Sequence, residues 1–256
     1  MQRCQKVALL RMYNTCMQQP AGFRHFTEVC EVASHVSRRF PPIHLKNRRT
    51  FTLFTKYETA KGVYQEGLQV LSSTNGLWER GQVLMYLAAA TGFTFDFERM
   101  RSWYEQSQAF LEQVGDTCAV ADVLKDRGAM LLLESHYKEA IDCLLGSMML
   151  CCELGHKQYL ATCLGRLSLA VGMRQEPDAE TASLHSAQLT GAVASLEEAI
   201  GLTPWTRTHA LVQRVGQQIR SRADPQPWQA ALTAGRALTV EQAIELAHRL
   251  RAGTPC

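Results

Sequence analysis

Cysteine is the residue of this chain with the greatest capacity for chemistry. Nine are present: Cys4, Cys16, Cys30, Cys118, Cys143, Cys151, Cys152, Cys163 and Cys256. No two form a C-x-x-C pair, and none combines with histidine at the spacing of a zinc site. Most stand where a helix needs a small apolar residue, so we interpret them as reduced, partly buried thiols of a cytoplasmic protein. A redox or catalytic role for one of them is the minor alternative.

Histidines and carboxylates offer no clearer site. The eight histidines are His25, His35, His44, His136, His156, His185, His209 and His248. Only Cys152 and His156 stand four residues apart, and one such pair does not predict a metal site. The acidic pair Glu197 and Glu198 occupies adjacent helical positions, which point apart and do not form a general acid/base pair.

Sequence motifs of catalysis and cofactor binding are missing as well. The chain contains no G-x-x-x-x-G-K-[S/T], G-x-S-x-G, H-E-x-x-H or G-x-G-x-x-G. We therefore predict no catalytic residues and no cofactor, and we expect a binding protein rather than an enzyme. An enzyme whose site escapes sequence motifs remains the alternative.

Charge and hydropathy argue against two classes of partner, nucleic acids and membranes. The net charge is +3, and the densest basic run comprises Arg38, Arg39, Lys46, Arg48 and Arg49. A solvated helix face explains this run better than phosphate contacts do, so nucleic acid is not an expected partner of this chain alone. No stretch approaches the 18 apolar residues of a membrane span, and no membrane partner is predicted.

The elements that carry these residues repeat along the chain. The segment 135–155 aligns with 96–115 after a shift of 40 residues, and Tyr57, Ala60, Tyr64 and Gly67 extend the match by one more shift. In the two clearest copies, Tyr137, Ala140, Leu144, Ser147 and Gly155 match Phe97, Met100, Tyr104, Ser107 and Gly115. This spacing is typical of one face of a helix. An irregular helical bundle with a chance echo is the alternative.

Each repeat is predicted to hold two helices, called helix A and helix B. Gly128 on helix A and Ala140 on helix B are both small, so the two helices can approach closely there. Gly115 and Gly155 stand where a left-handed cap ends helix B. Helix B of the last unit is expected to begin near Leu184 and to end at Gly201.

The alternation of small and large residues resembles the tetratricopeptide repeat. It departs from that family because Cys152 replaces the helix-ending proline and the period is about 40 residues rather than 34. The fold class expected is all-α, a right-handed α-solenoid of helix-turn-helix units with a C-terminal helical cap. Residues 1–42 would be N-terminal helices or a degenerate repeat, 43–201 the repeats, and 202–256 the capping helices.

The closing segment is more specific. The residues 187–201, followed by Trp228-x-x-Ala231 and by 235–244 (Gly-Arg-Ala-Leu-Thr-x-Glu-x-Ala-Ile), resemble the C-terminal end of bacterial LuxR/AfsR-type signal-transduction ATPases and transcriptional regulators. Locally, Gly235 is expected to end one helix, and Thr239 with Gln242 is expected to form a capping box for the next. Trp228 is expected to bury its ring against the preceding helix.

This resemblance implies a protein–protein interaction or sensor module of a bacterial signalling or transcription-regulatory system. In tetratricopeptide proteins the second and fifth positions of helix A line the concave binding face. Carried over to this chain, these positions are Gln82, Met85, Asp122, Lys125, Thr162 and Gly165. The expected ligand is a protein or peptide, and a homo-oligomer is left open. The alternative is a truncated regulator whose NTPase and DNA-binding parts lie on another chain.

Overall fold

The computed structural model describes residues 61–62, 64–69, 71–72, 76–91, 96–174, 178–201 and 210–251. Every regular element among them is an α-helix, which confirms the all-α prediction. The elements predicted within 1–42, the basic run, and the repeat positions Tyr57 and Ala60 lie outside the described residues. The chain divides into two compact units, residues 1–107 and 108–256, each taken by itself below.

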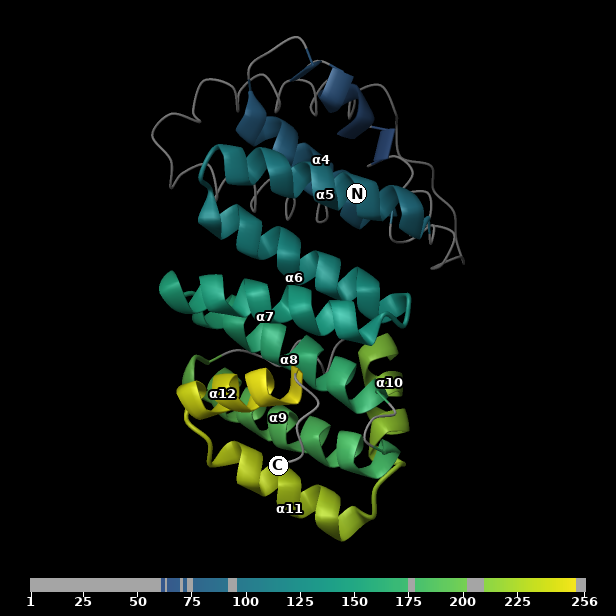
Figure 1. Ribbon diagram of the computed structural model, residues 1–256, viewed down its shortest axis with the longest axis vertical. Helices are drawn as coiled ribbons and strands as arrows, with labels where there is room; N and C mark the ends of the chain where they lie inside the picture. The colour runs from purple at the N-terminus through teal and green to yellow at the C-terminus, as the bar shows by residue number, and fades with distance from the viewer. Residues whose placement is uncertain are drawn as a thin grey trace, which may run out of the picture. The chain divides into compact units, whose positions relative to one another are not determined.

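The named helices follow one another along the chain (Figure 1). They are α4 (Leu77–Thr91), α5 (Phe97–Gln113), α6 (Thr117–Leu133), α7 (Tyr137–Glu153), α8 (Lys157–Met173), α9 (Ala179–Ala199), α10 (Ala210–Arg220), α11 (Pro225–Arg236) and α12 (Val240–Arg251). The described part of the first unit contains α4 and the start of α5. The remaining helices belong to the second unit.

The turns end the helices as the sequence predicted at two places. Gly115 and Gly155 have φ values of 72° and 66°, the left-handed region that glycine adopts without steric cost. At the second of these turns, the N–H of His156 donates to the carbonyl of Cys151 at 2.8 Å, which satisfies a carbonyl at the end of α7. Ser135 takes the same conformation, with φ 63°, between α6 and α7, and the sequence did not indicate this.

The predicted repeat appears as a recurring hydrogen bond. In the first unit, Ser107 donates its hydroxyl to the carbonyl oxygen of Gly81 at 2.7 Å. In the second, Ser147 donates to the carbonyl of Ala121 at 2.6 Å, and both bonds join residues 26 apart. Both hydroxyls are fully buried. Because donors and acceptors are each displaced by the 40-residue period, the same local contact joins α5 to α4 and α7 to α6.

The small residues also act as predicted. A Cβ added at Gly128 would lie 2.7 Å from Cγ of Leu144 and 3.4 Å from the carbonyl oxygen of Ala140. Since Leu144 and Ala140 are fully buried, no space remains for a side chain at this point. The close approach of α6 and α7 therefore depends on the glycine.

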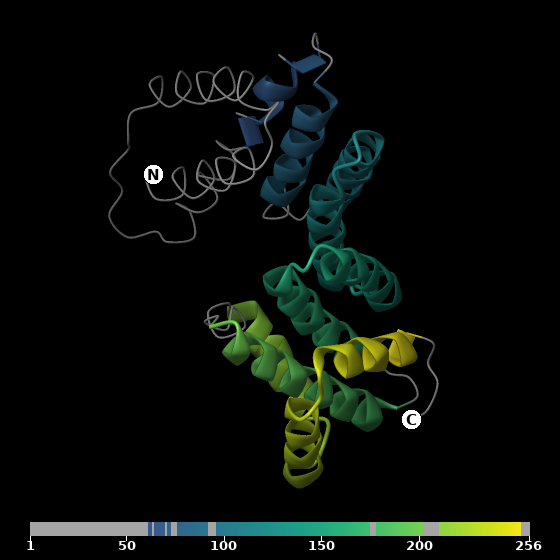
Figure 2. The same ribbon diagram turned by 90° about the vertical axis from the view of Figure 1, so that its left-hand side faces the viewer.

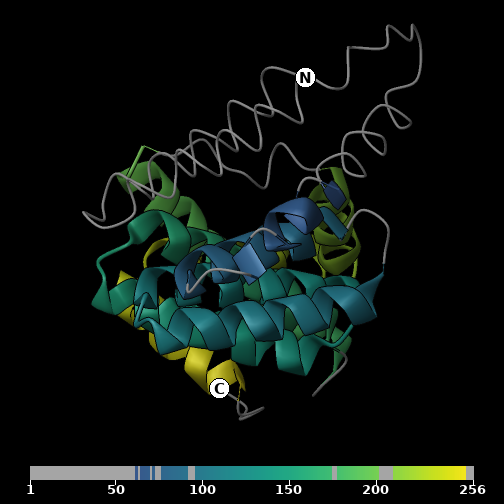
Figure 3. The same ribbon diagram turned by 90° about the horizontal axis from the view of Figure 1, so that it is seen from above.

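Beyond α7, successive packing of each helix on its predecessor continues through α8 and α9. Extensive contacts join α7 to α8 and α8 to α9, and α11 packs along α9. Helix α12 lies beside α7, α8 and α9 rather than continuing their succession (Figures 2 and 3). It contacts α7, α8 and α9, and Arg251 on α12 pairs with Asp142 on α7 at 2.6 Å.

Two local expectations need correction. Helix α9 begins at Ala179 rather than near Leu184, because Asp178 caps it by accepting a hydrogen bond from the N–H of Thr181 at 2.8 Å. Gly235 does not end a helix, since α11 continues through it to Arg236. Its role is a close approach: an added Cβ would lie 1.8 Å from the carbonyl oxygen of Gln188 on α9.

Two other expectations are confirmed. Thr239 and Gln242 form the capping box, with the N–H of Thr239 donating to Oε1 of Gln242 at 2.9 Å and the N–H of Gln242 donating to Oγ1 of Thr239 at 3.2 Å. Trp228 is 9% exposed and packs with Ile219 of the preceding helix and with Ala187. No described helix is long and apolar enough to cross a lipid bilayer.

Candidate functional site

The predicted binding positions of the first unit are buried. Gln82 and Met85 lie on α4 with 6% and 3% of their surface exposed. Their side chains are therefore not presented to solvent in this structure. The ligand-binding role predicted for them stays a prediction.

The predicted positions of the second unit lie on α6 and α8, which contact each other. Thr162 is half-buried, and its hydroxyl donates to the carbonyl of Gln158 at 3.0 Å within the same helix. Gly165 is buried, with Cγ1 of Val193 lying 3.8 Å from where its Cβ would stand. Asp122 and Lys125 form an ion pair on α6.

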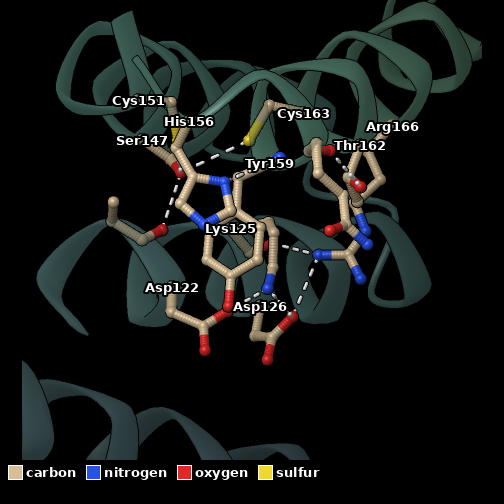
Figure 4. Close-up of polar contacts among 12 residues, drawn as sticks. Asp122, Lys125, Asp126, Ser147, Cys151, His156, Tyr159, Thr162, Cys163 and Arg166 are labelled. Atoms are coloured by element: carbon tan, nitrogen blue, oxygen red, sulfur yellow. Dashed lines mark hydrogen bonds and ion pairs between the residues drawn. The ribbon is translucent and has the colours of Figure 1, made fainter. Parts of the chain in front are cut away.

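That ion pair belongs to a larger group that we call the α6–α8 charge cluster: Asp122, Lys125 and Asp126 on α6, with Tyr159 and Arg166 on α8 (Figure 4). Nζ of Lys125 lies 3.5 Å from Oδ1 of Asp126. It also stands 4.3 Å from the centroid of the Tyr159 ring, a cation–π distance. The ammonium group of Lys125 therefore contacts Asp122, Asp126 and the Tyr159 ring.

Arg166 joins the two helices directly. Its NH1 group donates to the backbone carbonyl of Lys125 at 2.6 Å and to Oδ1 of Asp126 at 3.0 Å. The side chain of Arg166 is 13% exposed and that of Asp126 is 28% exposed. An ion pair screened this little by solvent, with a backbone acceptor as well, is worth more than a pair on an open surface.

The electrostatics of the cluster are internally balanced. Burial alone would raise the pKa of Asp126, but Lys125 and Arg166 outweigh it and lower that pKa below its usual value. Burial would lower the pKa of Lys125, but Asp126 and Asp122 outweigh it and raise that pKa. Burial, followed by repulsion from Asp122, raises the pKa of Tyr159. The cluster holds two acidic and two basic side chains, so its formal charges cancel.

The start of α8 orients this cluster. His156 precedes the helix and accepts the N–H of Tyr159 on Nδ1 at 3.4 Å, while the two rings pack at a tilt of 33° with centroids 4.1 Å apart. The histidine therefore acts as both helix cap and support for the Tyr159 ring. Through that ring it helps to define the position of Lys125.

A second polar group is buried behind the cluster. Ser147 and Cys151 on α7 meet Cys163 on α8, and Sγ of Cys163 donates to Oγ of Ser147 at 3.3 Å (Figure 4). The two cysteines are 1% and 0% exposed. This group adds a polar link between α7 and α8 within an otherwise apolar layer.

The chemistry available at this site is recognition through hydrogen bonds and shape. Both cations are already paired with carboxylates, so the cluster lacks the excess positive charge that would attract an acidic peptide tail. Among the described residues, no three histidine, cysteine or acidic side chains are grouped so that they could hold a metal ion.

Sequence reasoning selected Asp122 and Lys125 but missed Asp126, Tyr159 and Arg166. One signal was present: Asp126 and Arg166 are 40 residues apart, so they hold equivalent positions in consecutive repeats. Opposite charges at equivalent positions predict an ion pair between stacked helices.

Comparison of the chain with family models, with curated proteins and with solved structures found no match.

Proposed function

We propose that this chain is a tetratricopeptide-like solenoid that binds a protein or peptide on its helix-A face. In this proposal α4, α6 and α8 are the A helices, and the helices after α9 form the C-terminal cap. The chain acts as a recognition module and has no catalytic centre of its own.

One observation carries the proposal, namely the buried serine-to-carbonyl bond that recurs with the 40-residue period. A recurring bond of this kind indicates that helix pairs are built as copies of one unit rather than as parts of an irregular bundle. Stacked units of that type present rows of equivalent A-helix positions, which is the usual basis of peptide recognition by repeat proteins.

The α6–α8 charge cluster defines what kind of ligand suits this face. Its four charges cancel, and Arg166 is held by Asp126 and by a backbone carbonyl. A ligand rich in carboxylates would have to displace Asp126, so a neutral or mixed-charge segment is the better candidate. Thr162, half-buried beside the cluster, would lie at the edge of that contact.

The cellular setting is proposed from the resemblance of residues 187–201 and 228–244 to bacterial LuxR/AfsR-type proteins. On that basis the chain serves a cytoplasmic signalling or transcription-regulatory system as its interaction or sensor part. Within this setting its ligand is a protein or peptide rather than nucleic acid.

A pair of threonine substitutions tests the proposal. Thr162 on α8 and Thr233 on α11 both donate their hydroxyl to the carbonyl four residues earlier, at 3.0 and 2.9 Å. Thr162→Arg places a large cation on the helix-A face, and Thr233→Arg places the same group on the exposed surface of the cap. Both variants are first shown by circular dichroism and thermal unfolding to remain folded.

Tagged wild-type and variant proteins are then used to capture partners from a bacterial lysate, with quantitative mass spectrometry. We expect a protein that is retained by wild type and by Thr233→Arg but depleted at least tenfold by Thr162→Arg. Its affinity for the purified chain is then measured by calorimetry. Equal retention by both variants, or no retained protein and no self-association in analytical ultracentrifugation, contradicts the proposal.

A further inference from the structure

Two buried thiols face each other across the junction of α7 and α8. Oγ of Ser147 lies 3.3 Å from Sγ of Cys163 and 4.0 Å from Sγ of Cys151, so the two sulfur atoms flank one hydroxyl (Figure 4). The cysteines are 1% and 0% exposed, and the Ser147 hydroxyl proton is directed to the carbonyl of Ala121 at 2.6 Å. Ser147 therefore accepts the S–H of Cys163 rather than donating to that thiol.

The preceding repeat shows what packing alone requires at these positions. Leu111 and Val123 stand 40 residues before Cys151 and Cys163, and both are fully buried. Aliphatic side chains thus occupy the equivalent buried positions of α5 and α6. The replacement of both members by thiols in the next repeat adds a chemical capacity that the packing does not need.

We propose that Cys151 and Cys163 are a dithiol that a peroxide converts into a disulfide joining α7 to α8. In the first step the thiolate of Cys163 attacks one oxygen of hydrogen peroxide. The O–O bond breaks, Cys163 becomes a sulfenic acid, and the released hydroxide takes up a proton to become water. In the second step Sγ of Cys151 attacks Sγ of Cys163, its proton leaves with the sulfenic oxygen as a second water, and the S–S bond forms. The two sulfurs lose two electrons in total, which the peroxide gains.

The surroundings assign the two roles. The hydrogen bond with Cys151 lowers the pKa of Cys163, burial opposes this, and the charges of Arg166 and Lys125 lower the pKa further. The same hydrogen bond between the thiols, together with burial, raises the pKa of Cys151. Cys163 is therefore the attacking thiolate, and Cys151 is the resolving thiol.

Burial determines which oxidant can act. With the sulfurs shielded from solvent, a peroxide of the size of one or two water molecules can reach them through a brief opening of the α7–α8 junction. A disulfide as bulky as oxidised glutathione is excluded. The product would tie helix B of one repeat to helix A of the next and limit that opening.

The test uses the full chain carrying Cys152→Ser, which removes an exposed thiol adjacent to Cys151 and makes the fragment spectra unambiguous. The protein is treated with hydrogen peroxide, alkylated under denaturing conditions and digested without reduction. We expect a cross-linked peptide joining Cys151 to Cys163, lighter by two hydrogen atoms than its reduced parts and lost after dithiothreitol. The thermal midpoint of the oxidised protein should rise by several degrees.

Matched controls come from the preceding repeat. Cys151→Leu and Cys163→Val install the residues found at the equivalent positions, so both variants should fold and neither should show the cross-link or the rise in thermal midpoint. Cys163→Val should also leave Cys151 unoxidised, whereas Cys151→Leu should accumulate sulfenic or sulfinic acid on Cys163. The proposal is overturned if wild type forms no Cys151–Cys163 link, if its cross-links join other cysteines instead, or if Cys163 reacts equally with oxidised glutathione.

Discussion

Replacing Gly235 with alanine should disrupt the cap of the second unit. This glycine lies inside α11, and a Cβ there would stand 1.8 Å from the carbonyl oxygen of Gln188 and 2.7 Å from its carbonyl carbon. Real Cβ atoms do not come this close to backbone, and a helix backbone cannot rotate away as a side chain can. Helix α11 must therefore withdraw from α9 by more than an ångström.

The magnitude follows from two opposing effects. Alanine favours a helix over glycine by about 1 kcal/mol. Against this, withdrawal of α11 opens the contacts along α9 and pulls Trp228 away from Ala187 and Ile219, in a core cluster where Trp228 is only 9% exposed. A gap of about 1 Å forfeits a quarter to a half of each dispersion contact, and overpacking of this kind costs about 3 kcal/mol net. For a unit of this size the thermal midpoint should fall by about 6–12 °C.

Gly216 on α10 supplies the matched control. It is also a helical glycine, but nothing lies within 4 Å of the position its Cβ would occupy. Gly216→Ala should therefore stabilise the protein by about 0.5–1 kcal/mol, because only the helix preference acts. Both variants are measured by urea unfolding followed by circular dichroism, with the intrinsic fluorescence of the four tryptophans, which include Trp228, as a second probe.

A second glycine at the same crossing tests whether steric crowding between α9 and α11 causes the loss of stability. Gly191 on α9 meets α11 at the same crossing, where its Cβ would stand 2.1 Å from the carbonyl oxygen of Leu232. Since one withdrawal of α11 relieves both clashes, Gly191→Ala with Gly235→Ala should cost clearly less than the sum of the single changes. Additive costs, or a Gly235→Ala variant as stable as wild type, would refute the close approach of α9 and α11.

Three other predictions concern the second unit. Ser147→Ala should destabilise the protein by about 1.5 kcal/mol in urea unfolding, because the hydrogen bond to the carbonyl of Ala121 is lost within the core. Ser147→Thr should recover part of this stability if the hydroxyl is responsible, and none if the cost comes from packing. The free energy of unfolding should fall as the pH drops below about 4, because the pKa of Asp126 is lower in the folded state than in the unfolded state. Asp126→Asn should make this fall with pH shallower. An unchanged fall would contradict the stabilising role of the Asp126 carboxylate. Thr239→Ala should cost about 1 kcal/mol by removing the cap that pairs with Gln242, and Thr239→Ser should restore it.

Local rules account for what the sequence predicted well. Gly115 and Gly155 adopt positive φ because a left-handed residue ends each helix B, and a cap needs only its immediate neighbours. The Thr239–Gln242 box is equally local. Ser135 escaped prediction because a serine in the left-handed conformation has no sequence mark, and its φ of 63° follows from the turn that joins α6 to α7.

Gly235 illustrates a different limit. A glycine near the end of a helical pattern is interpreted by local rules as a terminator. Its role here is set by Gln188, which lies on α9 and far away in sequence. Only the knowledge that α9 and α11 cross could have distinguished a packing glycine from a capping one. The two segments on which the family resemblance rests meet at this crossing, so their glycines serve one contact.

The sequence could predict those residues of the candidate site whose positions are equivalent in consecutive repeats. Position within helix A led to Lys125, whereas its partners on α8 depend on how two A helices stack. The pairing of Asp126 with Arg166 follows once their shared repeat position is recognised. Tyr159 could not be inferred in this way, because its contact with Lys125 is a cation–π geometry set by the His156 cap.

The junctions of the second unit differ in what holds them. A charge network joins α6 to α8, a serine–thiol group joins α7 to α8, and bare backbone contact at two glycines joins α9 to α11. A carboxylate ligand at the first junction would compete with Asp126, which is tethered beside Arg166 and acts at a high effective concentration. Occupation by an acidic ligand would also break the link between α6 and α8, so part of its binding energy would be consumed in loosening the stack. Under the proposed function, a neutral or mixed-charge ligand would leave that link intact and would bind without this cost.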